Sequence, residues 1–117
     1  MVEEINIRKL MELYLDTIDK CGMYLLNSDN EVIEYNVFEE FDIGVVSFLH
    51  DDNLIRLKKA EIINDKILAK SCLLRDLVMK LQNGDKWNVG AVKNSTEWRE
   101  ILELADEIKV MIQNMKE

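Results

Sequence analysis

Apolar residues recur every three or four positions along most of this chain, a spacing typical of amphipathic helices. The pattern predicts a first helix over about residues 3–21, with a buried stripe formed by Ile7, Leu10, Met11, Tyr14, Leu15 and Ile18. Gly22 is a suitable residue to end this helix. The polar run NSDN at 27–30 predicts a loop whose last side chains cap the next helix.

The second apolar segment has two interpretations. A helix within about residues 31–49 would place on one face the side chains of Val37, Phe38, Phe41, Val45, Phe48 and Leu49. The competing interpretation is a strand over EVIEYNVF (31–38), which alternates in part and is rich in β-forming residues. The helix is favoured because the spacing from Phe38 onward is helical and no partner strand is evident.

Two further helices follow from polar caps placed before apolar stripes. Asp51 or Asp52 is expected to cap a short helix over NLIRLKKA. Asn64 or Asp65 is expected to cap a longer one that turns inward Ile67, Leu68, Ser71, Leu74, Leu77, Val78 and Leu81. The run QNGD at 82–85 predicts a turn.

The C-terminal region predicts one helical turn and one long helix. The turn falls within WNVGAVKNS at 87–95. Asn94 with Glu97 three positions later fits a capping box, and Ser95 is the alternative cap. The final helix, over about 96–115, is expected to bury Trp98, Ile101, Leu102, Ala105, Ile108 and Ile112.

Composition supports a helical fold and a single domain. The 117 residues include no proline and only four glycines, whereas antiparallel β folds need frequent turn residues. We therefore expect an all-α chain in which residues 1–117 form one compact bundle of about five helices. No apolar run approaches the ~18 residues of a membrane span, and the start MVEEINIRKL lacks the basic and apolar regions of a signal peptide. These features predict a cytoplasmic protein without membrane contact.

Charge is distributed unevenly along the chain. Between Lys20 and Arg56 there is no lysine or arginine, but there are eight acids: Asp29, Glu31, Glu34, Glu39, Glu40, Asp42, Asp51 and Asp52. Their charge of −8 equals the formal net charge of the whole protein. A solvated helix face is one explanation. However, like charges that no base relieves destabilise a folded protein, so a second use for them becomes credible.

A helical wheel suggests what that use is. At 100° per residue, Ile43 and Val46 fall outside the buried stripe and among the acids. Carboxylates that steer a basic partner, together with aliphatic side chains that hold it, are typical of an interface. The candidate partner-binding residues are Glu34, Glu39, Glu40, Asp42, Ile43, Val46, Asp51 and Asp52.

The inventory of reactive side chains is poor. One histidine and two separate cysteines, Cys21 and Cys72, form no metal-binding motif, and both thiols are expected to be buried and reduced. Ser47 and His50 lie three residues apart, but no motif surrounds them. We expect no cofactor, no metal and no enzymatic activity. The short basic group Arg56, Lys58 and Lys59 resembles a solvated helix face, so direct nucleic-acid binding is not expected.

The stretch WNVGAVKNSTEWREILELADEIKVM at 87–111 resembles the closing segment of small helical immunity proteins of bacterial toxin–immunity systems, including the contact-dependent growth inhibition type. The similarity lies in the Trp-x-Val-x-x-Val run, the Asn-Ser-x-Glu-Trp helix entry and the Leu-Ala-Asp-Glu-Ile stripe. It implies a cytoplasmic inhibitor that binds one cognate toxin, often a basic nuclease. The toxin-contacting residues of such proteins vary, so the resemblance assigns none here.

The resulting hypothesis is an immunity protein that neutralises a basic, nuclease-type toxin domain by stoichiometric occlusion. An interaction or adaptor module for another basic partner is the alternative from the same class. A small enzyme is the alternative from a different class.

Overall fold

The computed structural model describes residues 6–115, and in this part the chain forms helices and no strand. Five of the elements have seven or more residues, so the predicted all-α bundle of about five helices is confirmed. In chain order the elements are α1 (Ile7–Asp19), η1 (Met23–Asn27), α2 (Asn30–Ile33), η2 (Glu34–Phe41), α3 (Asp42–Ser47), α4 (Asp51–Lys59), α5 (Asp65–Leu81), α6 (Val89–Asn94) and α7 (Thr96–Met115).

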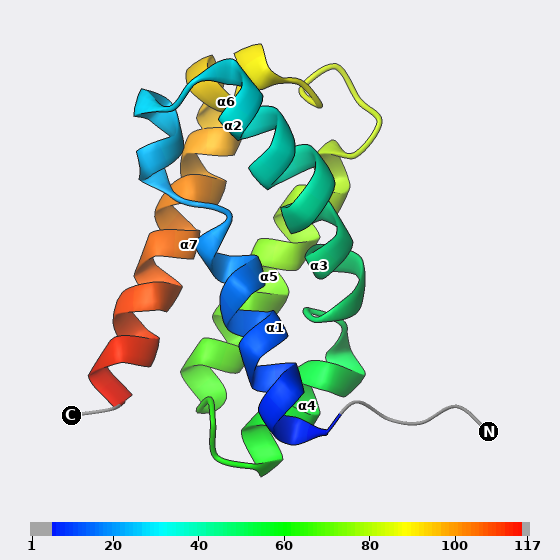
Figure 1. The fold of residues 1–117 in the computed structure, drawn as a ribbon, viewed down its shortest axis with the longest axis vertical. Coiled ribbons are helices and arrows are strands. Elements are labelled where there is room, and N and C mark those ends of the chain that lie inside the picture. Colours follow the sequence, from blue (N-terminus) through cyan, green and yellow to red (C-terminus); the bar gives the residue numbers. More distant parts are fainter. Residues whose placement is uncertain (1–5, 116–117) are drawn as a thin grey trace.

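The long helices form an up-down bundle (Figure 1). α1 and α5 run in one direction, while the continuous column α2–η2–α3 and α7 run in the other. α1 contacts α3 and α7, and α5 contacts the same two helices, so the four columns close into a ring. α4 and α6 are short connections at opposite ends of the bundle. Such an arrangement lets each column bury one apolar stripe toward the centre.

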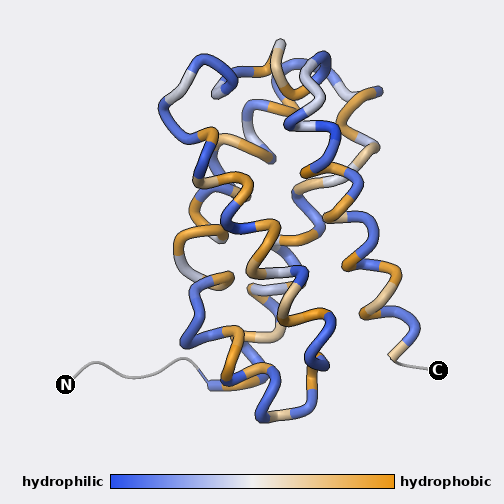
Figure 2. Tube along the Cα trace, turned by 180° about the vertical axis from the view of Figure 1, so that it is seen from behind, coloured by the Kyte–Doolittle hydropathy of each residue, from blue (hydrophilic) through white to orange (hydrophobic). Residues whose placement is uncertain are grey.

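Apolar and polar residues alternate along each column (Figure 2), as expected of amphipathic helices around one core. All six residues predicted to be buried in the last helix are buried. The hydroxyl groups of Tyr14 and Ser71 lie 2.8 Å apart within the core and join α1 to α5. Burial raises the pKa of Tyr14 to about 12.

Trp98 anchors the end of the bundle near α6. Its side chain is fully buried, and its indole Nε1–H donates to the carbonyl oxygen of Lys86 at 2.7 Å. The rings of Phe38 and Trp87 pack around it at centroid distances of 5.9 and 5.8 Å. This aromatic group fastens η2 and the 82–88 connection to the last helix.

The first helix is shorter than predicted. The side chain of Asn6 accepts a hydrogen bond from the backbone of Lys9 at 2.9 Å, so the helix begins at Ile7. The expected start over residues 3–5 lies outside the described residues. The helix ends at Asp19, before the expected stop at Gly22.

The strand alternative for residues 31–38 is wrong, because this segment is helical from Asn30 to Ser47. Residues 34–41, however, form a π-helix, with hydrogen bonds from residue i to i+5. The fully buried positions recur at intervals of four: Ile33, Val37, Phe41, Val45 and Leu49. In an ordinary α-helix each step of four would drift by about 40°, and the stripe by about 160° in total. The wider π turn reduces this drift and keeps the stripe facing the core.

Gly44 allows α3 to pack directly on α1. A Cβ atom built on Gly44 would collide with Oγ1 and Cγ2 of Thr17 and would lie 2.8 Å from the Thr17 Cβ. Thr17 is buried, and its hydroxyl donates to the carbonyl oxygen of Leu13 at 2.8 Å. The two helices therefore approach each other at a position where one of them has no side chain.

One of the predicted caps differs in the structure, and two are confirmed. The imidazole Nδ1 of His50 accepts from the backbone of Asp52, so α4 is capped by His50 rather than by Asp51 or Asp52. The predicted alternative cap at Ser95 is confirmed in place of the capping box at Asn94, because the Ser95 hydroxyl oxygen accepts from the backbone of Trp98 at 3.1 Å. The predicted cap at Asn64 is confirmed by its bond to the backbone of Ile67.

Candidate functional site

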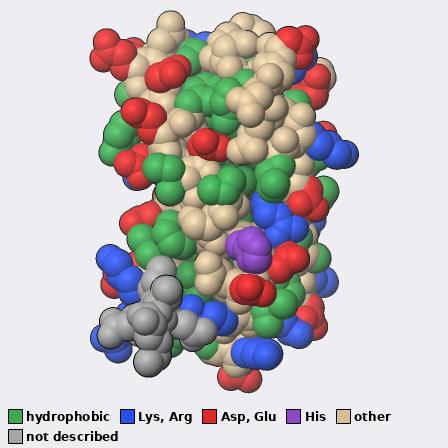
Figure 3. All heavy atoms as spheres, turned by 90° about the vertical axis from the view of Figure 1, so that its right-hand side faces the viewer, with side chains coloured by type: hydrophobic (Ala, Val, Ile, Leu, Met, Phe, Trp, Pro, Cys, Tyr) green, Lys and Arg blue, Asp and Glu red, His purple; other side chains and the backbone are tan. Residues whose placement is uncertain are grey.

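The outward side of the α2–η2–α3 column is both acidic and apolar. We define the acidic face as its exposed side chains within residues 31–46: Glu31, Val32, Glu34, Tyr35, Glu39, Glu40, Ile43 and Val46. Ile43 is 61% exposed and Val46 is 55% exposed, so two aliphatic side chains lie in solvent beside the carboxylates. Figure 3 shows acidic and hydrophobic side chains interspersed at the upper left of the flank that carries this column.

Basic side chains lie near this region but do not pair with its carboxylates within residues 6–115; Lys93, for example, lines a surface hollow together with Asp29 and Glu31. The six acids between residues 29 and 42 form no ion pair within 4.0 Å in the described part of the chain. The ion pairs that do form lie mostly within or between other helices, such as Lys70 with Glu107 at 2.8 Å. The negative field of the acidic face is thus left to solvent or to a partner.

The π-helix brings together Tyr35 and Glu40. The Tyr35 hydroxyl donates to Oε1 of Glu40 at 2.7 Å, and this bond raises the pKa of Tyr35. Residues five apart on an α-helix point about 140° away from each other. The smaller rotation per residue of a π-helix reduces this separation, so a wheel drawn at 100° per residue could not have predicted the contact.

Asp42 is partly withdrawn from the surface. It is half-buried, and its Oδ1 accepts from Nε2 of Gln82 at 2.6 Å, which ties α3 to the end of α5. This predicted partner-binding residue therefore also stabilises the connection between two columns.

Asp51 has an internal partner that sequence reasoning missed. Arg75 of α5 donates to its Oδ1 and also to the carbonyl oxygen of Leu49, at 3.0 Å. The guanidinium beside Asp51 lowers the pKa of that carboxyl. Arg75 is 24 residues away from Asp51 in the chain. The pair therefore depends on how α5 packs against the start of α4, which the sequence pattern does not show. Asp52, in contrast, is 89% exposed beside His50.

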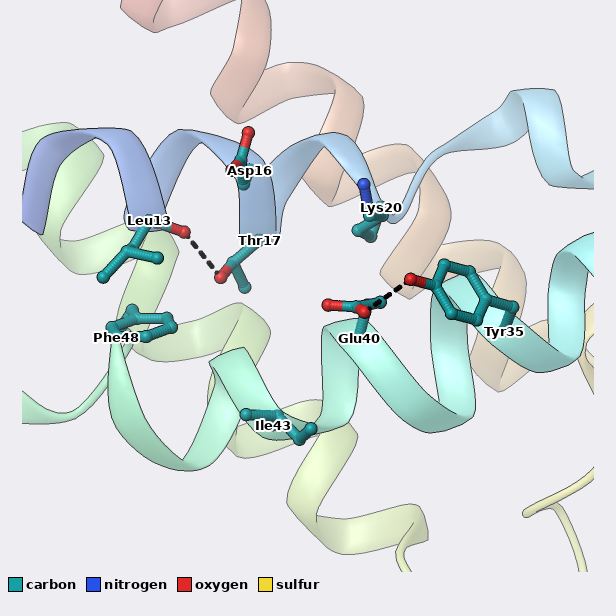
Figure 4. A pocket seen from close by; sticks show the side chains of 8 residues that line it. All are labelled: Leu13, Asp16, Thr17, Lys20, Tyr35, Glu40, Ile43 and Phe48. Atoms are coloured by element: carbon teal, nitrogen blue, oxygen red, sulfur yellow. Dashed lines mark hydrogen bonds between the residues drawn. The ribbon is translucent and has the colours of Figure 1, made fainter. Parts of the chain in front are cut away.

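A cavity opens between α1 and the acidic column (Figure 4). Its volume is about 280 Å³, and it is lined by Leu13, Asp16, Thr17, Lys20, Tyr35, Glu40, Ile43 and Phe48. We call it the α1–η2 cavity. The Glu40 carboxylate points toward α1 within it, while Phe48 and Ile43 form its apolar end. The structure therefore brings two of the predicted residues, Glu40 and Ile43, into one concave site together with residues that the prediction did not include.

The two cysteines are the remaining candidates for chemistry, and the Cys72 thiol donates to Oδ1 of Asp51 at 3.9 Å. Both cysteines are free; Cys21 is buried, which raises its pKa to about 12, while Cys72 is only partly buried and its pKa is also raised. Among residues 6–115, no group of three or more histidine, cysteine, aspartate or glutamate side chains is placed to hold a metal ion. No helix of this part is long and apolar enough to cross a membrane.

Comparison of the chain with protein-family models, with curated proteins and with solved structures found no match.

Proposed function

We propose that this protein is an immunity-type inhibitor that binds a basic, nuclease-type toxin domain and neutralises it by stoichiometric occlusion. The observation that carries the proposal is the acidic face, where carboxylates that form no ion pair within residues 6–115 lie among exposed aliphatic side chains. The resemblance of residues 87–111 to immunity proteins supports the same class of function.

The mechanism follows from the composition of this face. Glu34 and Glu39 are exposed and form no ion pair within residues 6–115, so they attract lysine and arginine side chains that a nuclease uses to hold phosphate. Ile43 and Val46 then provide apolar area, which the contact removes from water. Charge accelerates encounter and selects the partner, while the apolar contact slows dissociation.

The proposed function is tested with the product of the adjacent gene as the partner, provided that this product ends in a basic toxin domain. Co-expression should give a one-to-one complex and restore growth of cells that produce the toxin. Glu34→Lys with Glu39→Lys should weaken this complex about tenfold or more in calorimetry, because two favourable charge contacts become repulsive. The matched control, Asp85→Lys with Glu100→Lys, makes the same change in net charge at exposed acids without ion pairs in the described part of the chain.

If the two double variants lose the same affinity for the toxin domain, the effect is one of net charge alone, and the acidic face is not the binding surface. A complex with a basic partner that is not toxic would instead favour the adaptor function, which the same surface supports.

A further inference from the structure

We infer that the α1–η2 cavity is a socket for one arginine side chain of the basic partner, with Glu40 as the group that binds the guanidinium. This inference rests on the proposed function for the identity of the partner. It adds a specific contact, at Glu40, and the type of partner residue, an arginine, neither of which the acidic face alone defines.

The size of the cavity favours a single side chain. Pockets for small-molecule ligands usually enclose about 300–1,000 Å³, whereas this cavity measures about 280 Å³ and opens to solvent. A pocket that receives one anchoring residue is the typical centre of a protein interface, and arginine is enriched among such anchors.

The charges within the cavity favour a monovalent cation. Asp16, Glu40 and Lys20 are its charged lining residues, and together they carry −1. None of the three takes part in an ion pair in the described part of the chain. One bound guanidinium would neutralise the site without leaving a surplus charge.

Glu40 is prepared for this role. The Tyr35 hydroxyl donates to Oε1 and orients the carboxylate toward α1, and Oε2 has no hydrogen-bond partner among residues 6–115 (Figure 4). Each carboxylate oxygen has two lone pairs, so both can still accept from the planar fork of a guanidinium. The bond from Tyr35 restricts the side chain in advance and so reduces the entropy lost on binding.

The walls favour arginine over lysine. Ile43 and Phe48 form an apolar end, and Tyr35 adds a second ring at the opposite end. An arginine packs its methylene stem on apolar side chains and its guanidinium on aromatic faces, whereas the strongly hydrated ammonium of lysine does so less well. The exposed Ile43 at the mouth of the cavity then contacts the backbone or neighbouring side chains of the partner.

The experiment uses the full chain, labelled with ¹⁵N, and N-acetyl-arginine amide as the probe. The probe should shift the amide resonances of residues 13–20 and 35–48 in a saturable way, and N-acetyl-lysine amide should bind more weakly. Glu40→Gln should weaken binding of the arginine probe about tenfold, because it removes the charged acceptor. Glu100→Gln makes the same charge change at an exposed residue of α7 outside both the cavity and the acidic face, and it should alter binding less than about twofold.

Shifts that do not saturate, equal binding of the lysine probe, or binding that survives Glu40→Gln would overturn the inference. The two proposals fail separately. A toxin complex that is unaffected by Glu40→Gln would refute the socket and leave the inhibitor function. Binding of the arginine probe by a chain that binds no toxin would refute the inhibitor function and leave the cation site.

Discussion

Replacement of Gly44 by alanine tests the closest contact of the bundle. On an exposed helix this change stabilises a protein by about 0.5–1 kcal/mol, because glycine loses more conformational freedom on folding. Here the new Cβ would collide with the Thr17 side chain, and even the Thr17 Cβ would lie only 2.8 Å away. Rotation of the β-branched threonine cannot clear its own Cβ. Overpacking of this kind costs about 1–3 kcal/mol, so we expect a net loss of about 1–2 kcal/mol.

The free energy of unfolding is measured in urea by circular dichroism. Gly90→Ala is the matched control, because Gly90 is also helical, and its nearest neighbour, Oδ1 of Asn88, lies at an ordinary 3.4 Å from the added Cβ. This control should stabilise the protein by about 0.5–1 kcal/mol. In a Thr17→Ala background the cost of Gly44→Ala should fall by about 1 kcal/mol, as expected for two residues in contact. Stabilisation by Gly44→Ala in the wild-type background would refute the direct packing of α3 on α1.

Two further predictions concern the core and acid stability. Trp98→Ala should lower the free energy of unfolding by about 3–5 kcal/mol, because it leaves a cavity and removes the donor to Lys86; a loss below about 1 kcal/mol would contradict its burial. Since Arg75 lowers the pKa of Asp51, this pair stabilises the fold above the unfolded pKa of about 3.9 and loses its effect as the pH falls through the lowered value. The stability difference between wild type and Asp51→Asn should therefore shrink as the pH falls below about 4, and a constant difference would show that the pair is not formed.

Local patterns were sufficient to predict the helices but not their internal geometry. The stripe from Trp98 to Ile112 and the cap at Asn64 depend on neighbours within a few residues, so the sequence predicts them directly. The π-helix departs from the 100° rotation that a helical wheel assumes. Its signal was present in the interval of four between Ile33, Val37, Phe41, Val45 and Leu49.

In the candidate site, too, some features follow from the local sequence and others depend on how the helices pack. Exposure of Ile43 and Val46 followed from periodicity, and the structure agrees. The partner of Asp51 and the cavity behind Glu40 depend on how α5 and α1 pack against the acidic column, which no local pattern specifies. Whether these side chains bind a partner remains a prediction.

The interval of four between buried residues also determines how this surface is able to evolve. Each repeat commits one position to the core, and between these positions lie exposed residues such as Glu34, Glu39 and Val46, whose substitution can change recognition while the fold persists. A gain or loss of one residue is different, because it would shift every later core position out of line. Diversification of this column should therefore proceed through replaced residues at constant length, and two descendants with unlike partners would still share the same spacing from Ile33 to Leu49.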